Sequence, residues 1–347
     1  MKRERGDFRQ RSLFPRPARG SMKALVTGAA GFTAGHLCER LVREGYQVRG
    51  LVRNSSRYSE VRQTGVELVT GDLRDPDSLK QAVNGMDIVF HIAALFRSEN
   101  GSRKDMWNTN VQGTRNLLDA SVKAGVRRFV HCSTVGVHGD IKNPPANEET
   151  PYGPGDHYQE SKAEGERVVL RYMAEGRLPL VVFRPGAIYG PRDLRFLKLF
   201  RAIKRKQFIM LGSGQVTYHM IYIDDLIDGI LLCGTKETSI GGVYILAGEV
   251  PATLNQIAQV IADVVVVRPP KVHFPVAPVY LAGFLCELIC KPFGINPPLY
   301  RRRVDFFRKN RAFDISKAKR ELGFEPKTDL RTGIALTAEW YRKAGLL

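Results

Sequence analysis

The sequence predicts an α/β protein built on a doubly wound parallel sheet, followed by a smaller C-terminal lobe. Short apolar segments alternate with helical patterns from Met22 to about Val137, at the period of βαβ units. The first apolar segment, 22–26, leads into a glycine-rich turn, 27–35, and then into apolar residues at helical spacing in 36–43. Ligands of such sheets bind beyond the carboxyl ends of the strands.

The other elements follow from the same two patterns. Strands are expected at 48–52, 66–69, 87–92, 128–132, 180–183 and 243–246, where apolar runs are short and rich in β-branched residues. Helices are expected at 78–83, 108–124, 158–175, 194–206, 225–233 and 254–264. No internal repeat interrupts this order.

The glycine-rich turn predicts a phosphate-binding site. Glycine lets the backbone turn tightly and approach a ligand without a Cβ in the way. The N-terminus of the helix that follows offers unpaired N–H groups and the positive end of the helix dipole. A lone turn of this kind is weak evidence, but this one stands between a strand and a helix.

Composition indicates a globular protein with an unusual charge. The chain has 347 residues, of which 43% are hydrophobic and 25% charged, and its net charge is +18. Seven of the Lys and Arg residues lie in 1–21, a segment with little apolar periodicity that we expect to be a disordered basic tail. It lacks the apolar stretch of a secretory signal, although an organelle presequence is an alternative. Five scattered cysteines favour reduced thiols and a cytoplasmic location.

Tyr158 and Lys162 are candidate catalytic residues. Four positions apart on a predicted helix, they lie one above the other on the same face. A nearby ammonium lowers the pKa of a phenol, so Tyr158 could exchange a proton with a hydroxyl or carbonyl group. Pairs with this spacing also arise by chance in many helices.

Three further features follow predicted strands. Ser133 and Thr134 come after 128–132, where a hydroxyl could bind the reacting oxygen, although turns also use both residue types. Asp72 follows 66–69 and could meet the edge of an adenine or simply cap a helix. The small residues in 91–94 suit a close backbone approach to a cofactor, or plain packing.

In this order and spacing the features resemble the extended short-chain dehydrogenase/reductase superfamily, in particular its NAD-dependent epimerase/dehydratase and 3β-hydroxysteroid-dehydrogenase-like branch. The resemblance covers nearly all of 22–347. The turn matches Thr-Gly-x-x-Gly-x-x-Gly, except that Ala34 replaces the last glycine at a helix-packing position that tolerates alanine. The segments 184–191, 222–226 and 313–324 look like later motifs of the same superfamily.

The resemblance implies a Rossmann fold and hydride transfer between a nicotinamide and a hydroxyl or ketone of a small substrate. It makes Tyr158 the proton donor and acceptor, Lys162 the partner that lowers its pKa and holds the ribose, and Thr134 the ligand of the substrate oxygen, with Ser133 as the alternative. The expected cofactor-binding residues are Thr27, Gly28, Ala30, Gly31, Phe32, Arg53, Asp72, Leu73, Ala93, Ala94, Tyr158, Lys162 and Pro185. The expected substrate-binding residues are Ser133, Ala187, Tyr189, Tyr218 and His219, and no metal is expected.

The resemblance also divides the chain. Residues 22–185 are expected to form the dinucleotide-binding domain with the catalytic Tyr and Lys. Residues 186–347 are expected to form mainly the substrate-binding lobe, with some elements returning to the first domain. A homodimer is expected from the resemblance alone.

Arg53 favours NADP over NAD, although NAD is a possible cofactor. Members that prefer NAD carry an acidic residue at the end of the second strand, where this chain has Val52, Arg53 and, nearby, Arg57. A guanidinium pairs with a 2′-phosphate, whereas a carboxylate repels it. A solvated Arg53 is the alternative.

The substrate is expected to be small and apolar, either sterol-like or another hydroxy or keto compound. Nucleotide-sugar members usually have an Asn and an Arg that hold the diphosphate, where this chain has Ala187 and Tyr218. A diphosphate without partners would suffer an uncompensated desolvation cost. Arg192 or Arg195 could replace them, so a nucleotide-sugar epimerase or dehydratase is the alternative, and a non-catalytic dinucleotide-binding protein is a second one.

The apolar segment 276–290 is too short to span a bilayer. A core helix that also buries Cys286 and Cys290 is the favoured interpretation, with the basic residues of 301–311 solvated beyond it. Weak peripheral contact with anionic lipid is the alternative. No recognition module for nucleic acid is visible, so the charge supports only non-specific attraction.

Overall fold

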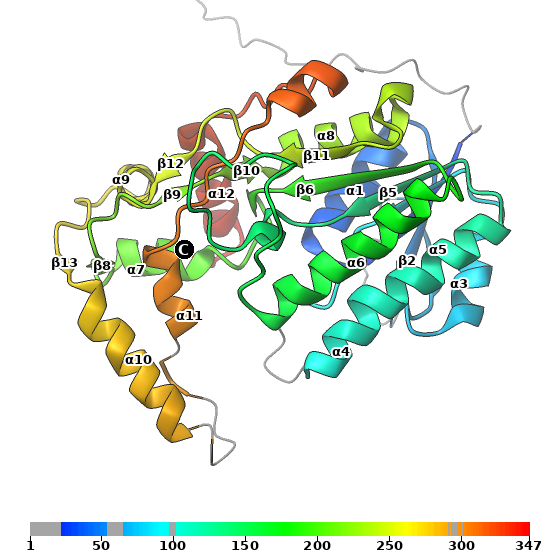
Figure 1. Ribbon diagram of the computed structural model, residues 1–347. Coiled ribbons are helices and arrows are strands. Elements are labelled where there is room, and N and C mark those ends of the chain that lie inside the picture. The colour runs from blue at the N-terminus through cyan, green and yellow to red at the C-terminus, as the bar shows by residue number, and fades with distance from the viewer. Residues whose placement is uncertain (1–21, 54–64, 97–101, 291, 293–296, 300) are drawn as a thin grey trace, which may run out of the picture.

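The computed structural model describes residues 22–53, 65–96, 102–290, 292, 297–299 and 301–347, without the side chains of Arg302 and Arg303. The predicted basic tail and Arg57 lie outside these residues. A seven-stranded sheet in the order β11-β6-β5-β4-β1-β2-β3 forms the centre (Figure 1). Its strands are β1 (Lys23–Thr27), β2 (Gln47–Val52), β3 (Glu67–Thr70), β4 (Ile88–His91), β5 (Arg128–Cys132), β6 (Leu180–Pro185) and β11 (Val243–Leu246). All pairs are parallel, which confirms the predicted doubly wound fold.

Helices cover both faces of this sheet. On one face pack α1 (Phe32–Arg43) and α8 (Ile223–Thr235), and on the other α3 (Pro76–Val83), α5 (Gly113–Lys123) and α6 (His157–Ala174). The buried strand residues alternate between the two cores: Ala24 and Val26 face one, and Leu25 faces the other. The strand order reverses between β1 and β4, so the crevice beyond these two strands is where this fold binds ligands.

The helix predicted at 108–124 starts earlier and contains an irregular turn. It begins with α4 (Arg103–Trp107), whose N-terminus is closed by a capping box between Ser102 and Asp105. A π-helical turn, η2 (Asn108–Gln112), then leads into α5. Single π-turns inside α-helices often mark functional sites.

The C-terminal part combines short paired strands with helices. Strand β7 (Ala187–Tyr189) pairs with β10 (Met220–Tyr222), β9 (Thr217–Tyr218) with β12 (Ala252–Thr253), and β8 (Met210–Leu211) with β13 (His273–Phe274). Helices α7 (Leu197–Lys204), α9 (Leu254–Val264) and α12 (Leu330–Lys343) pack around them. The short helices η3 (Val135–His138), η4 (Glu237–Ser239), α11 (Arg301–Val304), η6 (Asp305–Phe307) and η7 (Ala318–Leu322) complete the chain. From this part, β11 and α8 join the main sheet and its helical layer.

Helix α10 (Val276–Cys290) contradicts the predicted core helix. Of its residues only Gly283 is buried, and Cys286 and Cys290 are half-exposed free thiols. In Figure 1 the helix projects from the rest of the molecule, with α11 beside it. Within the described residues, no helix is both long and apolar enough to cross a membrane.

Candidate active site

A cavity of about 790 Å³ lies at the carboxyl ends of the strands. The loops after β1, β2, β3, β4, β5 and β6 all contribute to its wall, as the switch-point rule requires. Among the predicted cofactor-binding residues, those that line it are Gly28, Ala30, Gly31, Phe32, Arg53, Asp72, Leu73, Ala93, Ala94, Tyr158 and Pro185. Among the predicted catalytic and substrate-binding residues, those that line it are Ser133, Thr134, Tyr158, Ala187, Tyr218 and His219.

The glycine turn has the geometry of a phosphate cradle. Gly28 has a φ of +71°, and a Cβ there would lie 3.1 Å from both Cα and Cβ of Ala93. Helix α1 starts directly after Gly31, and no side chain caps its N-terminus. Its first N–H groups therefore face the cavity without a capping side chain, which suits an anionic phosphate.

Thr27 and Tyr189 do not line the cavity, which corrects two predictions. The Thr27 hydroxyl accepts hydrogen bonds from the backbone N–H of Ile92 and Ala93 at 3.1 and 3.0 Å and bonds His91 Nδ1 at 2.9 Å, so it ties β1 to β4. Tyr189 is 3% exposed and packs edge-on against Tyr222. Both side chains are structural because the backbone turns them into the core.

Asp72 and Arg53, the two polar residues predicted to bind the adenosine part of the cofactor, both line the cavity but differ in their partners. Arg74 donates to the Asp72 carboxylate from its backbone N–H at 2.8 Å, from Nε at 2.9 Å and from Nη2 at 2.7 Å. These hydrogen bonds lower the pKa of Asp72. Arg53 directly follows β2 and is exposed, and among the described residues no carboxylate lies within ion-pair distance of it.

The structure separates the two candidate hydroxyls after β5. Ser133 is 3% exposed and its hydroxyl donates to the carboxylate of Glu166, away from the cavity. Thr134 Oγ1 accepts only the N–H of Gly136, at 3.1 Å, at the start of η3. A hydroxyl that accepts one bond still has its proton to donate, so Thr134 is the better ligand for a substrate oxygen.

Tyr158 and Lys162 both lie on α6, but only Tyr158 reaches the cavity wall. Its ring contacts that of Phe96, which comes from the loop after β4, with centroids 4.8 Å apart. Lys162 is 4% exposed, and its Nζ donates to the carbonyl of Cys132 at 2.6 Å. Burial lowers the pKa of Lys162. Its predicted contact with a ribose stays a prediction.

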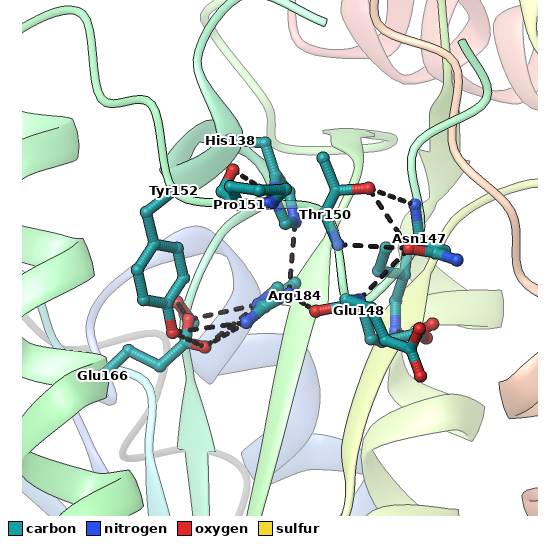
Figure 2. A network of polar contacts seen from close by, with 11 residues as sticks. His138, Asn147, Glu148, Thr150, Pro151, Tyr152, Glu166 and Arg184 are labelled. Carbon is teal, nitrogen blue, oxygen red and sulfur yellow. Dashed lines mark hydrogen bonds and ion pairs between the residues drawn. The ribbon is translucent and has the colours of Figure 1, made fainter. Parts of the chain in front are cut away.

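Behind the wall that carries Thr134, a buried polar network surrounds Arg184 (Figure 2). Arg184 Nε and Nη2 donate to Glu166 Oε1 at 3.0 and 2.5 Å, and the two residues are 3% and 0% exposed. Tyr152 donates to Glu166 at 2.8 Å, and Arg184 Nη1 donates to His138 Nε2 at 3.1 Å and to the Glu148 carbonyl at 2.9 Å.

Every strong donor and acceptor in this network therefore has a partner. Burial, followed by the charge of Glu166, raises the pKa of Tyr152 to about 12, so its phenol stays protonated and donates. Burial and the guanidinium charge lower the pKa of His138, which stays neutral and accepts from Arg184. A fully satisfied buried network has little freedom to rearrange, so it holds β5, β6 and α6 in a fixed relation below Thr134 and Tyr158.

Sequence reasoning missed Asn110, which lies in the π-turn η2. Its side-chain amide accepts from the N–H of Leu95 at 2.7 Å and donates to the Leu95 carbonyl at 3.1 Å and to Ser161 Oγ at 2.9 Å. Ser161 in turn donates to the carbonyl of Tyr158. Asn110 thereby joins the loop after β4 to the start of α6, and only the irregular helical turn, invisible in the sequence, marks it.

Sequence reasoning also missed Arg311, which lines the cavity near Tyr218. Its Nη1 donates to the Tyr218 hydroxyl at 2.5 Å and to the Lys309 carbonyl at 3.1 Å, and its guanidinium lies 4.7 Å from the Tyr218 ring centre. Within the described residues it has no carboxylate partner. His219 beside it is fully used, since its nitrogens bond the Gly248 carbonyl and the Phe313 N–H.

The two arginines that were expected to compensate for a missing diphosphate ligand have partners of their own. Arg192 pairs with Glu39 at 2.6 Å and is absent from the cavity wall. Arg195 lines the cavity and pairs with Asp193 at 2.7 Å. No group of three or more His, Cys, Asp or Glu side chains within the described ranges could hold a metal ion.

The NAD-dependent epimerase/dehydratase family profile matches residues 24–247, which include the glycine turn, Thr134, Tyr158 and Lys162. The chain belongs to this family. It is an NAD(P)-dependent enzyme of the extended short-chain dehydrogenase/reductase superfamily, as the motifs predicted.

Three similar proteins illustrate the range of the family. The chain is 30% identical to "3beta-hydroxysteroid-dehydrogenase/decarboxylase isoform 1" of Arabidopsis thaliana, over 91% of this chain and 78% of that protein. Among solved structures, the protein gox2253 matches with a TM-score of 0.82 and 31% identity, covering 94% of this chain and 100% of its own. A UDP-glucose 4-epimerase of Thermotoga maritima, solved with UDP-glucose, matches with a TM-score of 0.74 and 25% identity, over 93% and 99% of the two chains.

The residues present fit the dinucleotide of this family. A Cβ at position 28 would press on Ala93, and the cavity runs from Arg53 at the end of β2 to Pro185 at the end of β6. Gly28, Gly31 and the N-terminus of α1 would hold the phosphates, and Thr134 and Tyr158 mark the reacting end. When bound, the nicotinamide supplies or accepts a hydride. With the cofactor bound, Tyr158 would be placed to exchange a proton with a hydroxyl group, and Thr134 to donate to the same oxygen, as the sequence predicts.

Proposed function

We propose that the protein is an oxidoreductase that interconverts a hydroxyl and a ketone on a small apolar substrate, with NADP as its preferred cofactor. The observation that carries the chemistry is that Thr134 and Tyr158 line the same cavity, while the Ser133 hydroxyl is bonded to Glu166. A donor hydroxyl and a phenol at one wall can together hold and protonate a single oxygen atom.

The apolar character of the substrate is supported by the residues at the far end of the cavity. Its lining includes Phe96, Ala187, Ile188, Tyr218 and Phe313, alongside the polar residues Arg195, His219 and Arg311. Tyr218 donates its hydroxyl to the Phe306 carbonyl, so it presents mainly its ring. The relative from Arabidopsis thaliana, whose name describes a steroid dehydrogenase, supports the same substrate class.

A substrate panel tests this proposal. The purified protein would be assayed with NADPH and ketosteroids, small apolar ketones and UDP-sugars, by following the absorbance of the reduced nicotinamide. We expect turnover of at least one apolar ketone and none of UDP-sugars. Conversion of a UDP-sugar in the absence of ketone turnover would reject the proposal.

The preference for NADP depends on Arg53. Because Arg74 holds the Asp72 carboxylate, the Arg53 guanidinium stays available to pair with a 2′-phosphate. Arg53→Glu should lower kcat/KM for NADPH by at least about tenfold and leave that for NADH unchanged or higher. Arg43→Glu, which makes the same charge change at the exposed end of α1, is the matched control. A wild-type protein that uses NADH equally well would contradict the assignment.

A nucleotide-sugar epimerase or dehydratase is the second candidate, and Arg311 is the observation that favours it. A guanidinium that lines the cavity without a carboxylate partner can bind a diphosphate or another anionic group. Calorimetric titration with UDP-glucose separates the two candidates. Binding that Arg311→Gln weakens by about tenfold or more, and that Arg308→Gln leaves intact, would support the second candidate. No binding to the wild-type protein would reject it.

Three broader expectations belong to the proposal. The homodimer is one of them, and size-exclusion chromatography with light scattering tests it. The cytoplasm fits five free cysteines and an NADP-linked reaction. We propose no specific nucleic-acid partner, because the charge alone supports only non-specific attraction.

A further inference from the structure

Helix α10 carries an apolar stripe that faces away from the protein. Five large residues recur at helical spacing, and their exposed fractions are 40–64%. They are Leu281, Phe284, Leu285, Leu288 and Ile289. An apolar stripe of this kind normally packs on a core. Here the helix stands off the body of the molecule (Figure 1). The Arg301 guanidinium lies 4.9 Å from the ring centre of Phe284, but the described residues leave all five side chains exposed.

Contacts on the opposite side of α10 hold the helix in place, so the orientation of the stripe is fixed. Glu287 is the single acidic residue of the helix. Its carboxylate accepts from the backbone N–H of Arg301 at 2.8 Å, from Nε at 3.1 Å and from Nη2 at 2.9 Å. The guanidinium of Arg308 lies 4.2 Å from the ring centre of Tyr280. The chain thus neutralises the only carboxylate and orients the helix.

Three more exposed apolar residues lie in or next to β8 and β13, and Gly212 after β8 lies against Val276 at the start of α10. The N–H of Met210 donates to the carbonyl of Val272 where β8 meets β13, which brings the segments around these strands together. Ile209, Val272 and Phe274 are 52%, 62% and 48% exposed. We call these three residues and the five of the stripe the apolar patch.

Exposed cations lie next to the apolar patch in the chain. Lys204 ends α7 and is followed by Arg205 and Lys206, just before Ile209, and Lys271 directly precedes Val272. Anionic headgroups would complement these charges, and acyl chains would cover the apolar side chains. A second copy of the chain docked on the same patch would bring the lysines and arginines of both copies close together. Their repulsion disfavours a dimer through this patch.

We infer that the apolar patch docks the protein on the surface of an anionic lipid bilayer. At 1.5 Å per residue, the 15 residues of α10 extend roughly 22 Å, less than the ~30 Å hydrocarbon core. The helix therefore lies in one leaflet and does not cross the membrane. Peripheral helices of this kind bury their apolar face about 5–10 Å deep.

The helix that carries the docking surface is linked to the substrate end of the cavity through α11 and η6. Residues 305–307 follow α11, which packs beside α10, and the Phe306 carbonyl accepts the hydroxyl of Tyr218, a cavity residue. The rings of Tyr218 and Phe306 lie 4.8 Å apart. An apolar substrate dissolved in the bilayer would therefore enter the cavity from its membrane side. This consequence rests on the proposed function, whereas the docking itself does not.

Vesicle flotation with the full-length protein tests the inference. Vesicles of phosphatidylcholine, with or without phosphatidylglycerol, would be floated through a density gradient with wild type and with the double variant Leu285→Glu/Leu288→Glu. We expect wild type to float with the anionic vesicles, and the variant to bind at least about tenfold more weakly. Ile240→Glu/Leu336→Glu adds the same charges at residues of similar exposure, 42% and 40%, and should float like wild type.

Three outcomes would overturn the inference. Wild type that fails to float with anionic vesicles is one, and an equal loss of binding in the control variant is another. The third is a dimer in sedimentation equilibrium that the stripe variant dissolves, with no vesicle binding by wild type, because the patch would then join two copies. Melting temperature and NADPH binding check that each variant folds. Since flotation needs no turnover, its result is independent of the substrate panel.

Discussion

The cavity wall around Thr134 and Tyr158 and the helix α10 differ in whether energetically costly side chains find partners within the chain. Behind the wall, the charges of Arg184 and Glu166 are buried, and each finds its partners within the chain. On α10, apolar side chains such as Leu288 and Ile289 stay 58% and 64% exposed among the described residues. The difference fits the two proposals. Buried partners hold the wall rigid around Tyr158, where we propose proton transfer, and α10 exposes apolar side chains where we infer that a bilayer binds.

If this wall serves proton transfer, removing the phenol hydroxyl of Tyr158 should have the largest effect on turnover. Tyr158→Phe keeps the ring that contacts Phe96 but removes the group that exchanges the proton. Turnover should fall by about 10²–10⁴-fold. Steady-state kinetics would measure the loss, and the fluorescence of bound NADPH should show unchanged cofactor affinity. Activity near the wild-type level would show that another group transfers the proton.

The rigidity of the wall itself can be tested by removing its carboxylate. Glu166→Ala leaves the Arg184 guanidinium buried without its counter-charge, so the free energy of unfolding should fall by about 3–5 kcal/mol. Glu164→Ala is the matched control on the same helix, because its pair with Arg167 is partly exposed and is worth about 0–1 kcal/mol. Urea unfolding would compare the two. Equal losses would mean that the buried pair does not stiffen the wall.

The link between the wall and the loop after β4 should show a smaller effect. Asn110→Ala removes three hydrogen bonds, to Leu95 and Ser161, and leaves the partly buried N–H of Leu95 unpaired. We expect a loss of about 1–3 kcal/mol in stability, with a lower kcat because the start of α6 loosens. Gln112→Ala, on the same turn but exposed, should change stability by no more than about 0.5 kcal/mol. Unchanged kcat in the Asn110 variant would separate stability from positioning.

The smallest expected effect is that of His91→Gln on the slope of the unfolding free energy with pH. Burial lowers the pKa of His91 to about 3, from the ordinary 6.5. The unfolded chain therefore binds a proton below pH 6.5 that the folded protein does not, so stability is complete above 6.5 and falls as the pH decreases. His91→Gln should reduce this slope between pH 6.5 and 5 by up to about 1.4 kcal/mol per pH unit.

A variant that keeps His91 supplies the control for this measurement. Gln112→Ala replaces an exposed residue without an ionisable group, so it should leave the slope of stability with pH unchanged. Thermal melts of both variants over the same pH range would compare the slopes. Equal slopes in wild type and in His91→Gln would contradict a neutral buried His91.

Much of the sheet and its site could be predicted because both leave local patterns in the sequence. The strand–turn–helix at 22–43 predicted the cradle that Gly28 forms, and the spacing of Tyr158 and Lys162 predicted their shared helix. The positions of Thr27 and Tyr189 could not be predicted, since a motif gives the residue but not the direction of its side chain.

The features that sequence reasoning missed depend on distant segments. Arg311 reaches the cavity because its backbone N–H donates to the Thr217 carbonyl, a pairing between segments 94 residues apart. The exposure of α10 was mispredicted because an apolar 15-residue segment has the same sequence pattern whether it packs on a protein core or on a bilayer. Only the fold shows that the rest of the described chain leaves this segment exposed.

The most direct test of the central claim is the stoichiometry of the nicotinamide during one turnover. Enzyme, NADPH and the best apolar ketone of the panel would be mixed in equal amounts, and the oxidised cofactor and the alcohol product counted. An oxidoreductase that uses Tyr158 should consume one NADPH for each alcohol formed, and Tyr158→Phe should consume almost none. A substrate that is converted while the amount of NADPH stays constant would contradict net hydride transfer and indicate an epimerase.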